Sequence, residues 1–86
     1  MTMNDKAATQ QIGKNIRSLR LEAGMTQQKL GKMMDVSFQQ IQKYETGANR
    51  ISAAKLWRMA QVLDVPVEVF FEGLDRRQKP KLSRCS

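Results

Sequence analysis

Residues that start and stop α-helices recur at short intervals between positions 9 and 74, and this spacing constrains the fold more than any other feature. From Thr9 the apolar residues follow helical spacing as far as Gly24, which is a natural C-terminal stop. Three hydroxyl residues can cap further helices: Thr26, Ser37 and Ser52. Pro66 fits the first turn of a short fifth helix. With no strand-like alternation, the sequence predicts an all-α fold, a compact bundle of five short helices.

The apolar residues of these helices define the expected core. They recur three or four residues apart, as one buried side of a helix requires, and are Ile12, Ile16, Leu19, Ala23, Leu30, Met34, Ile41, Tyr44, Ala53, Leu56, Trp57, Ala60 and Leu63. Gly31 marks a place where another helix can approach closely. We interpret Trp57 and the six Met residues as core or gap-filling side chains rather than a ligand site.

The length of 86 residues fits a single domain. Residues 1–8 show no periodicity and are expected to form a flexible N-terminus. Residues 9–74 are expected to form the domain, and residues 75–86 a basic tail without an apolar face. The single cysteine, Cys85, cannot form an internal disulfide, so nothing in the sequence indicates an oxidising compartment.

Basic charge is concentrated in one part of the chain. The net charge is +7. Residues 6–58 contain ten Lys or Arg against three acidic residues, whereas residues 59–75 contain four acidic residues and no cation. Residues 76–86 add five cations. A basic segment followed by an acidic one favours a polyanionic partner on one side of the fold.

Residue types that carry other chemistry are missing or scattered. There is no His, the carboxylates are dispersed, and neither a glycine-rich phosphate loop nor metal-ligand spacing occurs. We therefore expect no enzyme activity, cofactor, metal or small-molecule ligand. No apolar run approaches the roughly 18 residues of a membrane span, and the first residues show no signal-peptide pattern. The expected location is cytoplasmic, in association with the nucleoid.

Residues 26–46 are rich in side chains that bind nucleic acids. They are typical of two short helices joined by a tight turn at Asp35 and Val36, and Asp is among the few residues that tolerate a left-handed backbone. The outer face of the second of these helices consists almost wholly of amides and cations, which hydrogen-bond base edges and phosphates. This face predicts binding to double-stranded DNA.

A pattern of residues spread over several helices runs without internal gaps through residues 12–71. It consists of Ile16, Arg17, Leu19, Arg20, Gly24, Met25, Thr26, Gln27, Leu30, Gly31, Val36, Ser37, Ile41, Tyr44, Glu45, Gly47, Leu56, Ala60, Leu63 and Val65. This pattern resembles the phage-repressor (Cro/repressor, or XRE) helix-turn-helix family. The resemblance implies a lambda-repressor-like DNA-binding domain in which the second and third helices form the motif, with residues 38–46 in the major groove.

The resemblance also implies that Arg20 and Glu45 form an ion pair between the first and third helices. Removing one partner of a partly buried pair is expected to be costly. The chain departs from the family pattern at two positions. Asp35 stands in the turn where the family usually has Gly, and Met33 stands where the family is usually polar.

Candidate base contacts come from the third helix. Helical spacing directs Ile41 and Tyr44 to the core, so the outer face is Phe38, Gln39, Gln42, Lys43 and Thr46. The expected base contacts are Phe38, Gln39 and Gln42. Gln39 is the first candidate, because a Gln can form two hydrogen bonds with adenine, worth about 1–3 kcal/mol of discrimination. Phe38 either packs on a thymine methyl group or covers the turn between the two helices.

Candidate contacts with the DNA backbone lie around this face and are Gln27, Gln28, Gln40, Lys43, Asn49 and Arg50. Gln27 stands at a helix N-terminus, where free backbone N–H groups attract phosphate. Gln40 lies three residues after Ser37, so its alternative role is to complete a capping box. For Lys43 and Arg50 the alternative is a solvated cation.

Members of the resembled family usually dimerise to read two half-sites about one helical turn apart, so a homodimer is expected. Val69 and Phe71 are candidate dimer contacts, because the fifth helix is more apolar than one buried stripe requires; alternatively, Phe70 and Phe71 close the core. The expected function is sequence-specific DNA binding by a transcriptional regulator that represses. The alternative is the antitoxin of a toxin–antitoxin pair, which binds a protein as well as DNA.

Overall fold

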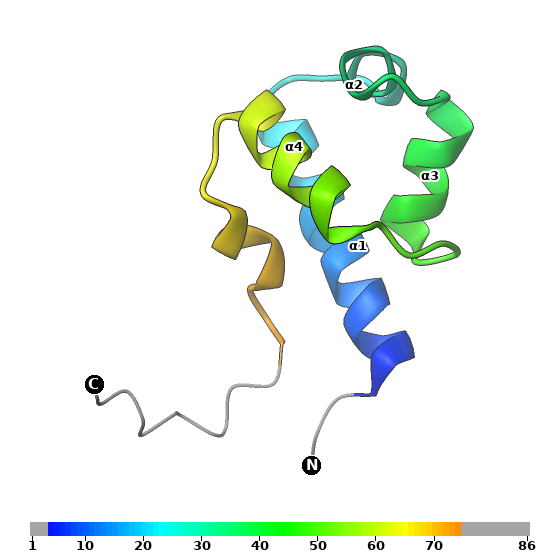
Figure 1. Cartoon of the computed structure of the whole chain (residues 1–86), viewed down its shortest axis with the longest axis vertical. Helices are drawn as coiled ribbons and strands as arrows, with labels where there is room; N and C mark the ends of the chain where they lie inside the picture. The colour runs from blue at the N-terminus through cyan, green and yellow to red at the C-terminus, as the bar shows by residue number, and fades with distance from the viewer. Residues whose placement is uncertain (1–3, 75–86) are drawn as a thin grey trace.

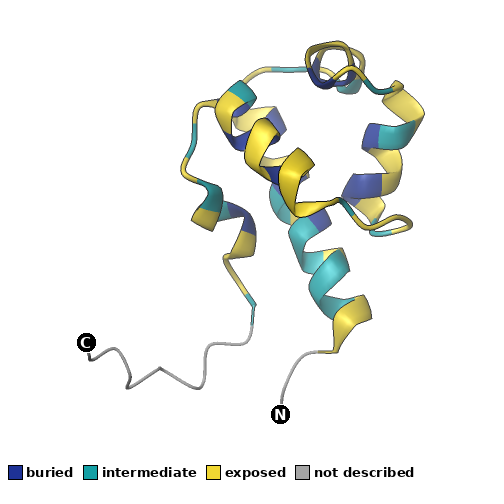
Figure 2. Ribbon diagram, in the orientation of Figure 1, coloured by how far each residue is buried: buried dark blue, intermediate teal, exposed yellow. Residues whose placement is uncertain are grey.

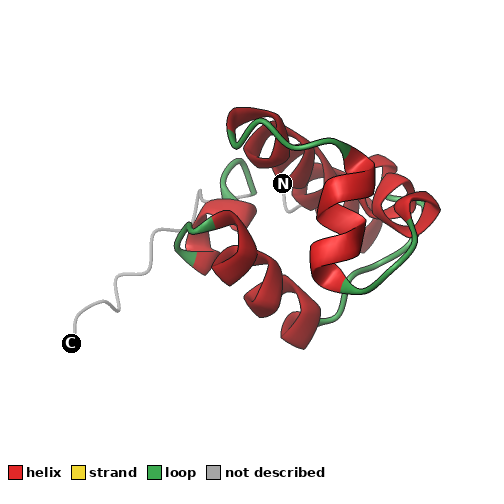
Figure 3. Ribbon diagram, turned by 90° about the horizontal axis from the view of Figure 1, so that it is seen from above, coloured by secondary structure: helices red, strands yellow, loops and turns green. Residues whose placement is uncertain are grey.

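The computed structural model describes residues 4–74, which form four α-helices followed by a 3-10 helix. The elements are α1 (Asp5–Glu22), α2 (Gln27–Met34), α3 (Phe38–Thr46), α4 (Ala53–Leu63) and η1 (Val67–Phe71) (Figure 1). Short loops join them, and the described residues contain no strand (Figure 3), which confirms the all-α prediction. The predicted fifth helix is the five-residue η1. The basic tail, including Cys85, lies outside the described residues.

Helix α1 begins four residues earlier than the sequence predicts. It starts at Asp5 rather than at Thr9, because the Asn4 Oδ1 accepts a hydrogen bond from the Ala7 N–H at 2.8 Å and so caps the helix. The predicted flexible segment 1–8 is therefore wrong for residues 5–8, which are helical. The apolar pattern missed this turn because Asp5 and Lys6 are exposed and have no core to face.

The other helix starts are where the cap residues predict them. The hydroxyl of Thr26 accepts from the Lys29 N–H at 3.0 Å. The hydroxyl of Ser52 accepts from the Lys55 N–H at 3.1 Å. Each bond satisfies one of the N–H groups that the first turn of a helix leaves unpaired. Local sequence thus sets the first residues of α2 and α4.

Aspartates end two of the helices in the left-handed conformation. Asp35 ends α2 with φ 60°, and Asp64 ends α4 with φ 58°. The N–H of Val36 donates to the Gly31 carbonyl oxygen at 2.9 Å, which closes the turn between α2 and α3. The turn therefore forms with Asp35 in the place where the resembled family usually has Gly.

The core runs through the middle of the bundle, between the helices (Figure 2). Its buried apolar side chains are Ile16, Leu30, Met34, Ile41, Tyr44, Leu56, Met59, Ala60, Leu63 and Phe70. Ile12 and Leu19 are partly buried against this cluster. The four members from α4 are Leu56 and the residues three, four and seven positions after it, which is the spacing of one face of a helix.

Trp57 is not part of this core, which corrects the prediction made from its apolar character. Its side chain is 58 % exposed. Successive helical residues are rotated by about 100°, so Trp57 is turned well away from Leu56, the preceding residue of the buried stripe. Three other residues that were expected in the core are exposed as well, namely Ala23, Met33 and Ala53.

Two glycines allow the backbone segments of the motif to approach closely. A Cβ atom on Gly13 of α1 would lie 2.6 Å from the Glu45 carbonyl oxygen of α3 and would also overlap that of Tyr44. A Cβ on Gly31 would lie 2.8 Å from the Val36 carbonyl oxygen. Gly31 was expected to lie beside another helix. The segment that packs closely against it is the turn leading into α3. These contacts set the position of α3 on the domain.

Candidate nucleic-acid interface

A buried ion pair joins α1 to α3. Arg20 Nε lies 2.6 Å from Glu45 Oε2, and Arg20 Nη2 donates to Glu45 Oε1 at 3.1 Å. Arg20 Nη1 also donates to the Met25 carbonyl oxygen at 2.8 Å. The Glu45 side chain is only 3 % exposed, so its carboxylate is shielded from water and held by fixed donors. The orientation of α3 relative to α1 depends on these bonds.

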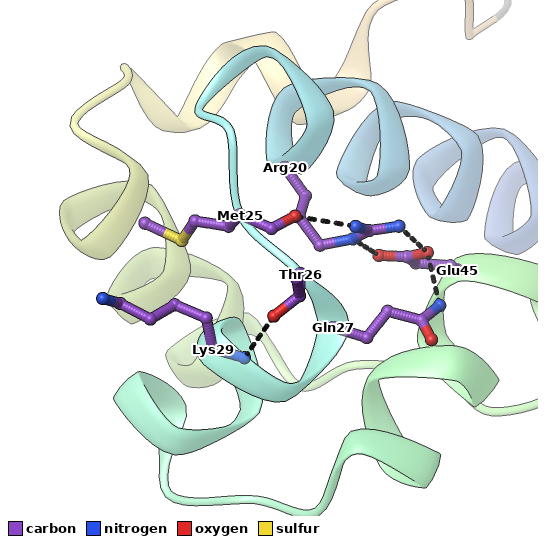
Figure 4. A network of polar contacts seen from close by, with 6 residues as sticks. All are labelled: Arg20, Met25, Thr26, Gln27, Lys29 and Glu45. Carbon is purple, nitrogen blue, oxygen red and sulfur yellow. Dashed lines mark hydrogen bonds and ion pairs between the residues drawn. The ribbon is translucent and has the colours of Figure 1, made fainter.

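Gln27 extends this network to the start of α2. Its Nε2 donates to Glu45 Oε1 at 3.1 Å, and the close-up shows its side chain directed toward the ion pair (Figure 4). The amide nitrogen carries two hydrogens, so one of them is left for a second acceptor. From the sequence, Gln27 is expected to contact a phosphate. Its bond to Glu45 has no signal in the sequence, because that bond depends on how α2 packs against α3.

The side of α3 that faces away from the core is exposed and mostly polar. Ile41, Tyr44 and Glu45 are buried. The exposed residues of the helix are Phe38, Gln39, Gln42, Lys43 and Thr46. All three candidate base contacts therefore lie on one surface of α3, as helical spacing predicts.

Gln40 is half-buried near the start of α3. The Ser37 hydroxyl accepts from the Gln40 N–H at 3.1 Å, which is one half of the expected capping box. Within residues 4–74 the other half, from the Gln40 side chain to the Ser37 N–H, is not formed. The Gln40 side chain therefore does not serve the cap.

A hollow of about 460 Å³ opens between α1, α2 and α3. Its walls are Arg17, Gln27, Gln42, Lys43, Glu45 and Thr46. It brings together three candidate DNA contacts that lie on two helices. It also includes Arg17 of α1, which the sequence interpretation did not select for DNA. The sequence contains one indication that Arg17 belongs to this site: it lies three residues before Arg20 and therefore on the same side of α1.

A second, more open groove of about 510 Å³ runs between α2 and the start of α3. It is lined by Gln28, Lys29, Lys32, Val36 and Phe38. Phe38 and the turn residue Val36 line the same groove. The ring is still 37 % exposed, so part of it stays open to solvent next to two lysines.

The loop after α3 presents the two remaining candidates, Asn49 and Arg50, both exposed. The Asn49 N–H donates to the Lys43 carbonyl oxygen at 3.2 Å, which ties the loop to the end of α3. Arg50 Nη2 lies 3.9 Å from the exposed Asp5 Oδ2. An exposed pair at this distance contributes little stability, so it leaves the Arg50 side chain free to reorient toward a phosphate.

The candidate dimer contacts lie apart from these residues. In Figure 1, η1 and α3 are at opposite sides of the molecule with α1 and α4 between them. Phe70 is completely buried, whereas Phe71 is 42 % exposed and Val69 is partly buried. Of the two side chains that were alternatively expected to close the core, only Phe70 does so.

Within residues 4–74, no group of three or more His, Cys, Asp or Glu side chains is placed to hold a metal ion. In the same residues, no helix has the length and apolar character needed to cross a membrane.

Comparison with known proteins identifies the family. The sequence profile of the helix-turn-helix family matches residues 16–70, which is more than half of the chain. An uncharacterized HTH-type transcriptional regulator of Rickettsia conorii is 49 % identical over 70 residues, covering 81 % of this chain and 56 % of that protein. One from Sinorhizobium medicae is 51 % identical over 61 residues, covering 71 % of this chain and 44 % of that protein. The chain thus spans about half the length of these relatives.

A solved structure agrees with this assignment. The HTH_3-family transcriptional regulator from Vibrio cholerae superposes with a TM-score of 0.73 at 25 % identity, over 79 % of this chain and 38 % of that one. The relatives are named as regulators and not as enzymes, in keeping with the expectation that this chain is not an enzyme. The chain belongs to the helix-turn-helix family of transcriptional regulators.

Proposed function

We propose that the chain binds double-stranded DNA in a sequence-specific manner, with α3 in the major groove, and represses transcription from the sites that it occupies. The observation that carries this proposal is the exposed face of α3, where Gln39, Gln42 and Lys43 stand clear of the core. A major groove about 12 Å wide admits an α-helix, and amides distinguish base pairs there.

The surroundings of α3 support the proposal through charge and rigidity. Lys29, Lys32 and Arg50 are exposed on α2 and on the loop after α3, where they can meet phosphates on either side of the groove. The ion pair of Arg20 and Glu45 and the bond from Gln27 hold α3 against α1 and α2. A rigid helix preserves the geometry that base contacts require.

Two matched substitutions test sequence-specific binding. On a duplex selected for tight binding, Gln39→Ala is expected to lower preference at one base position by about 1–3 kcal/mol, because that contact reads a base edge. Arg50→Ala is expected to weaken all sequences alike and to reduce the salt dependence. Fluorescence anisotropy against single-base variants of the duplex measures both effects. Unchanged specificity and affinity for Gln39→Ala would exclude its base-reading role.

A domain bound to promoter DNA can repress transcription by blocking access to that DNA. Repression of this kind requires no surface that contacts the transcription machinery. In-vitro transcription from a promoter that overlaps the selected site is expected to fall as protein is added. A rise in transcript would show activation instead.

We further propose that two copies bind together, through Val69 and Phe71 of η1. A second copy allows recognition of two half-sites about one helical turn apart. Phe71 is the more exposed of the two side chains, and an exposed aromatic side chain on a short element is suited to such a contact. Sedimentation equilibrium tests the proposal, with Phe71→Ala expected to shift the protein toward monomer. A strict monomer with and without DNA would exclude it.

A further inference from the structure

We infer that Arg17 of α1 binds a DNA backbone phosphate at the hollow between α1, α2 and α3, an assignment that rests on the proposed DNA binding. The hollow is the place where the three helices of this side of the domain meet. Arg17 is the residue of α1 that lines the hollow, and Lys43 lines it from α3.

The net charge of the hollow is positive although a carboxylate lies in its wall. Both oxygens of Glu45 accept hydrogen bonds from Arg20, at 2.6 and 3.1 Å, and its side chain is almost fully buried. Arg20 therefore neutralises Glu45 locally. The charges of Arg17 and Lys43 remain, and both side chains are exposed to solvent. An anion that enters from solvent meets these two cations first.

Polar donors complete the site. Gln27 uses one of its two amide hydrogens in the bond to Glu45, which holds the amide at the wall of the hollow. The guanidinium of Arg17 can donate two parallel hydrogen bonds to one phosphate. Together these groups suit the phosphate of a DNA backbone that passes along the start of α2 while α3 occupies the groove.

The fold does not require Arg17. Its side chain forms no ion pair and no hydrogen bond within residues 4–74, and it is exposed on α1. A substitution here is expected to leave the structure intact, so its effect on DNA can be measured directly.

The salt dependence of binding tests the assignment. The logarithm of the binding constant falls with the logarithm of salt concentration by about 0.9 per phosphate neutralised. R17A is expected to reduce this slope by about 0.9 and to weaken binding about eightfold at about 0.1 M salt, the factor that one lost phosphate contact gives by the same relation. R17K keeps the cation and is expected to keep most of the slope. R58A removes an exposed cation of α4 that does not line the hollow, and is expected to keep the slope.

Neutral methylphosphonate linkages, placed one at a time in the duplex, locate the phosphate. At one position the neutral linkage is expected to weaken binding by the wild type but not to weaken R17A further. A wild-type slope for R17A, or an equal loss of slope for R58A, would overturn the assignment while leaving DNA binding itself standing. Failure of the wild type to bind any selected duplex would overturn the proposed function and this assignment together.

Discussion

At the scale of single residues, Arg20 and Glu45 are the only charged side chains buried among residues 4–74. Glu45→Ala leaves the Arg20 guanidinium buried without its partner, and is expected to lower the free energy of unfolding by about 3–5 kcal/mol. Urea unfolding followed by far-ultraviolet circular dichroism measures the change.

The exposed acid Glu22 supplies the control for this prediction. Glu22→Ala is expected to change the free energy of unfolding by no more than about 0.5 kcal/mol. The double variant Arg20→Met with Glu45→Leu replaces the pair by apolar side chains and is expected to lose less than Glu45→Ala alone. Equal losses for Glu45→Ala and the double variant would show that the unpaired charge of Arg20 is not the cause of the lost stability.

Trp57 and Phe70 are both aromatic, yet the first is mostly exposed and the second is completely buried. Trp57→Ala is therefore expected to cost less than about 1 kcal/mol of stability, whereas Phe70→Ala is expected to cost about 3–5 kcal/mol. Thermal unfolding of the two variants compares them directly. A loss for Trp57→Ala as large as that for Phe70→Ala would contradict the exposed position of the indole.

At the scale of helices, the contact of α1 with α3 depends on Gly13. A Cβ atom there would lie 2.6 Å from the Glu45 carbonyl oxygen, and a helix backbone cannot yield as a flexible side chain does. Gly13→Ala is expected to destabilise the domain by about 1–3 kcal/mol, in spite of the up to about 1 kcal/mol that Ala gains in helix propensity. Ser18→Ala on an exposed part of α1 is the matched control for urea unfolding. If Gly13→Ala were more stable than the wild type, α1 and α3 could not be packed as closely at Gly13 as the 2.6 Å distance indicates.

Helix boundaries were predictable where the signal is local. Thr26, Ser37 and Ser52 each cap the helix that they were expected to start. The start of α1 was missed because its first turn lies beyond the core and carries no apolar pattern. The position of Trp57 was missed because hydrophobicity alone does not say which edge of an apolar stripe turns outward.

The residues of the candidate site also divide into those that the sequence could predict and those that it could not. The outer face of α3 follows from helical spacing, so Gln39 and Gln42 could be selected from the sequence. For Arg17 the sequence offers only its spacing from Arg20, and the bond between Gln27 and Glu45 has no sequence signal, because both depend on the packing of α1, α2 and α3 around one hollow. Gly13 likewise has no signal in the sequence, since the carbonyl groups that it meets belong to α3.

At the scale of the whole molecule, the candidate DNA contacts and the acids of η1 lie on different sides. The candidate DNA contacts and the cations Arg17, Lys43 and Arg50 belong to α1, α2, α3 and the loop that follows α3. Three of the acidic side chains lie at the end of α4 and on or next to η1, namely Asp64, Glu68 and Glu72. Since η1 and α3 are at opposite sides (Figure 1), Glu68 and Glu72 are kept away from a duplex that α3 approaches, whereas the exposed Asp5 lies beside Arg50. In the proposed complex, such an arrangement would help to orient the domain on DNA before any base is read.

Selection of bound duplexes from a random pool, carried out at two salt concentrations, tests sequence-specific DNA binding most directly. One short motif is expected to be enriched at both concentrations, because base contacts from α3 persist while phosphate contacts weaken as salt rises. Fewer duplexes should be retained at the higher concentration, with the motif unchanged. A pool that stays random at both salt concentrations would contradict sequence-specific binding by this domain.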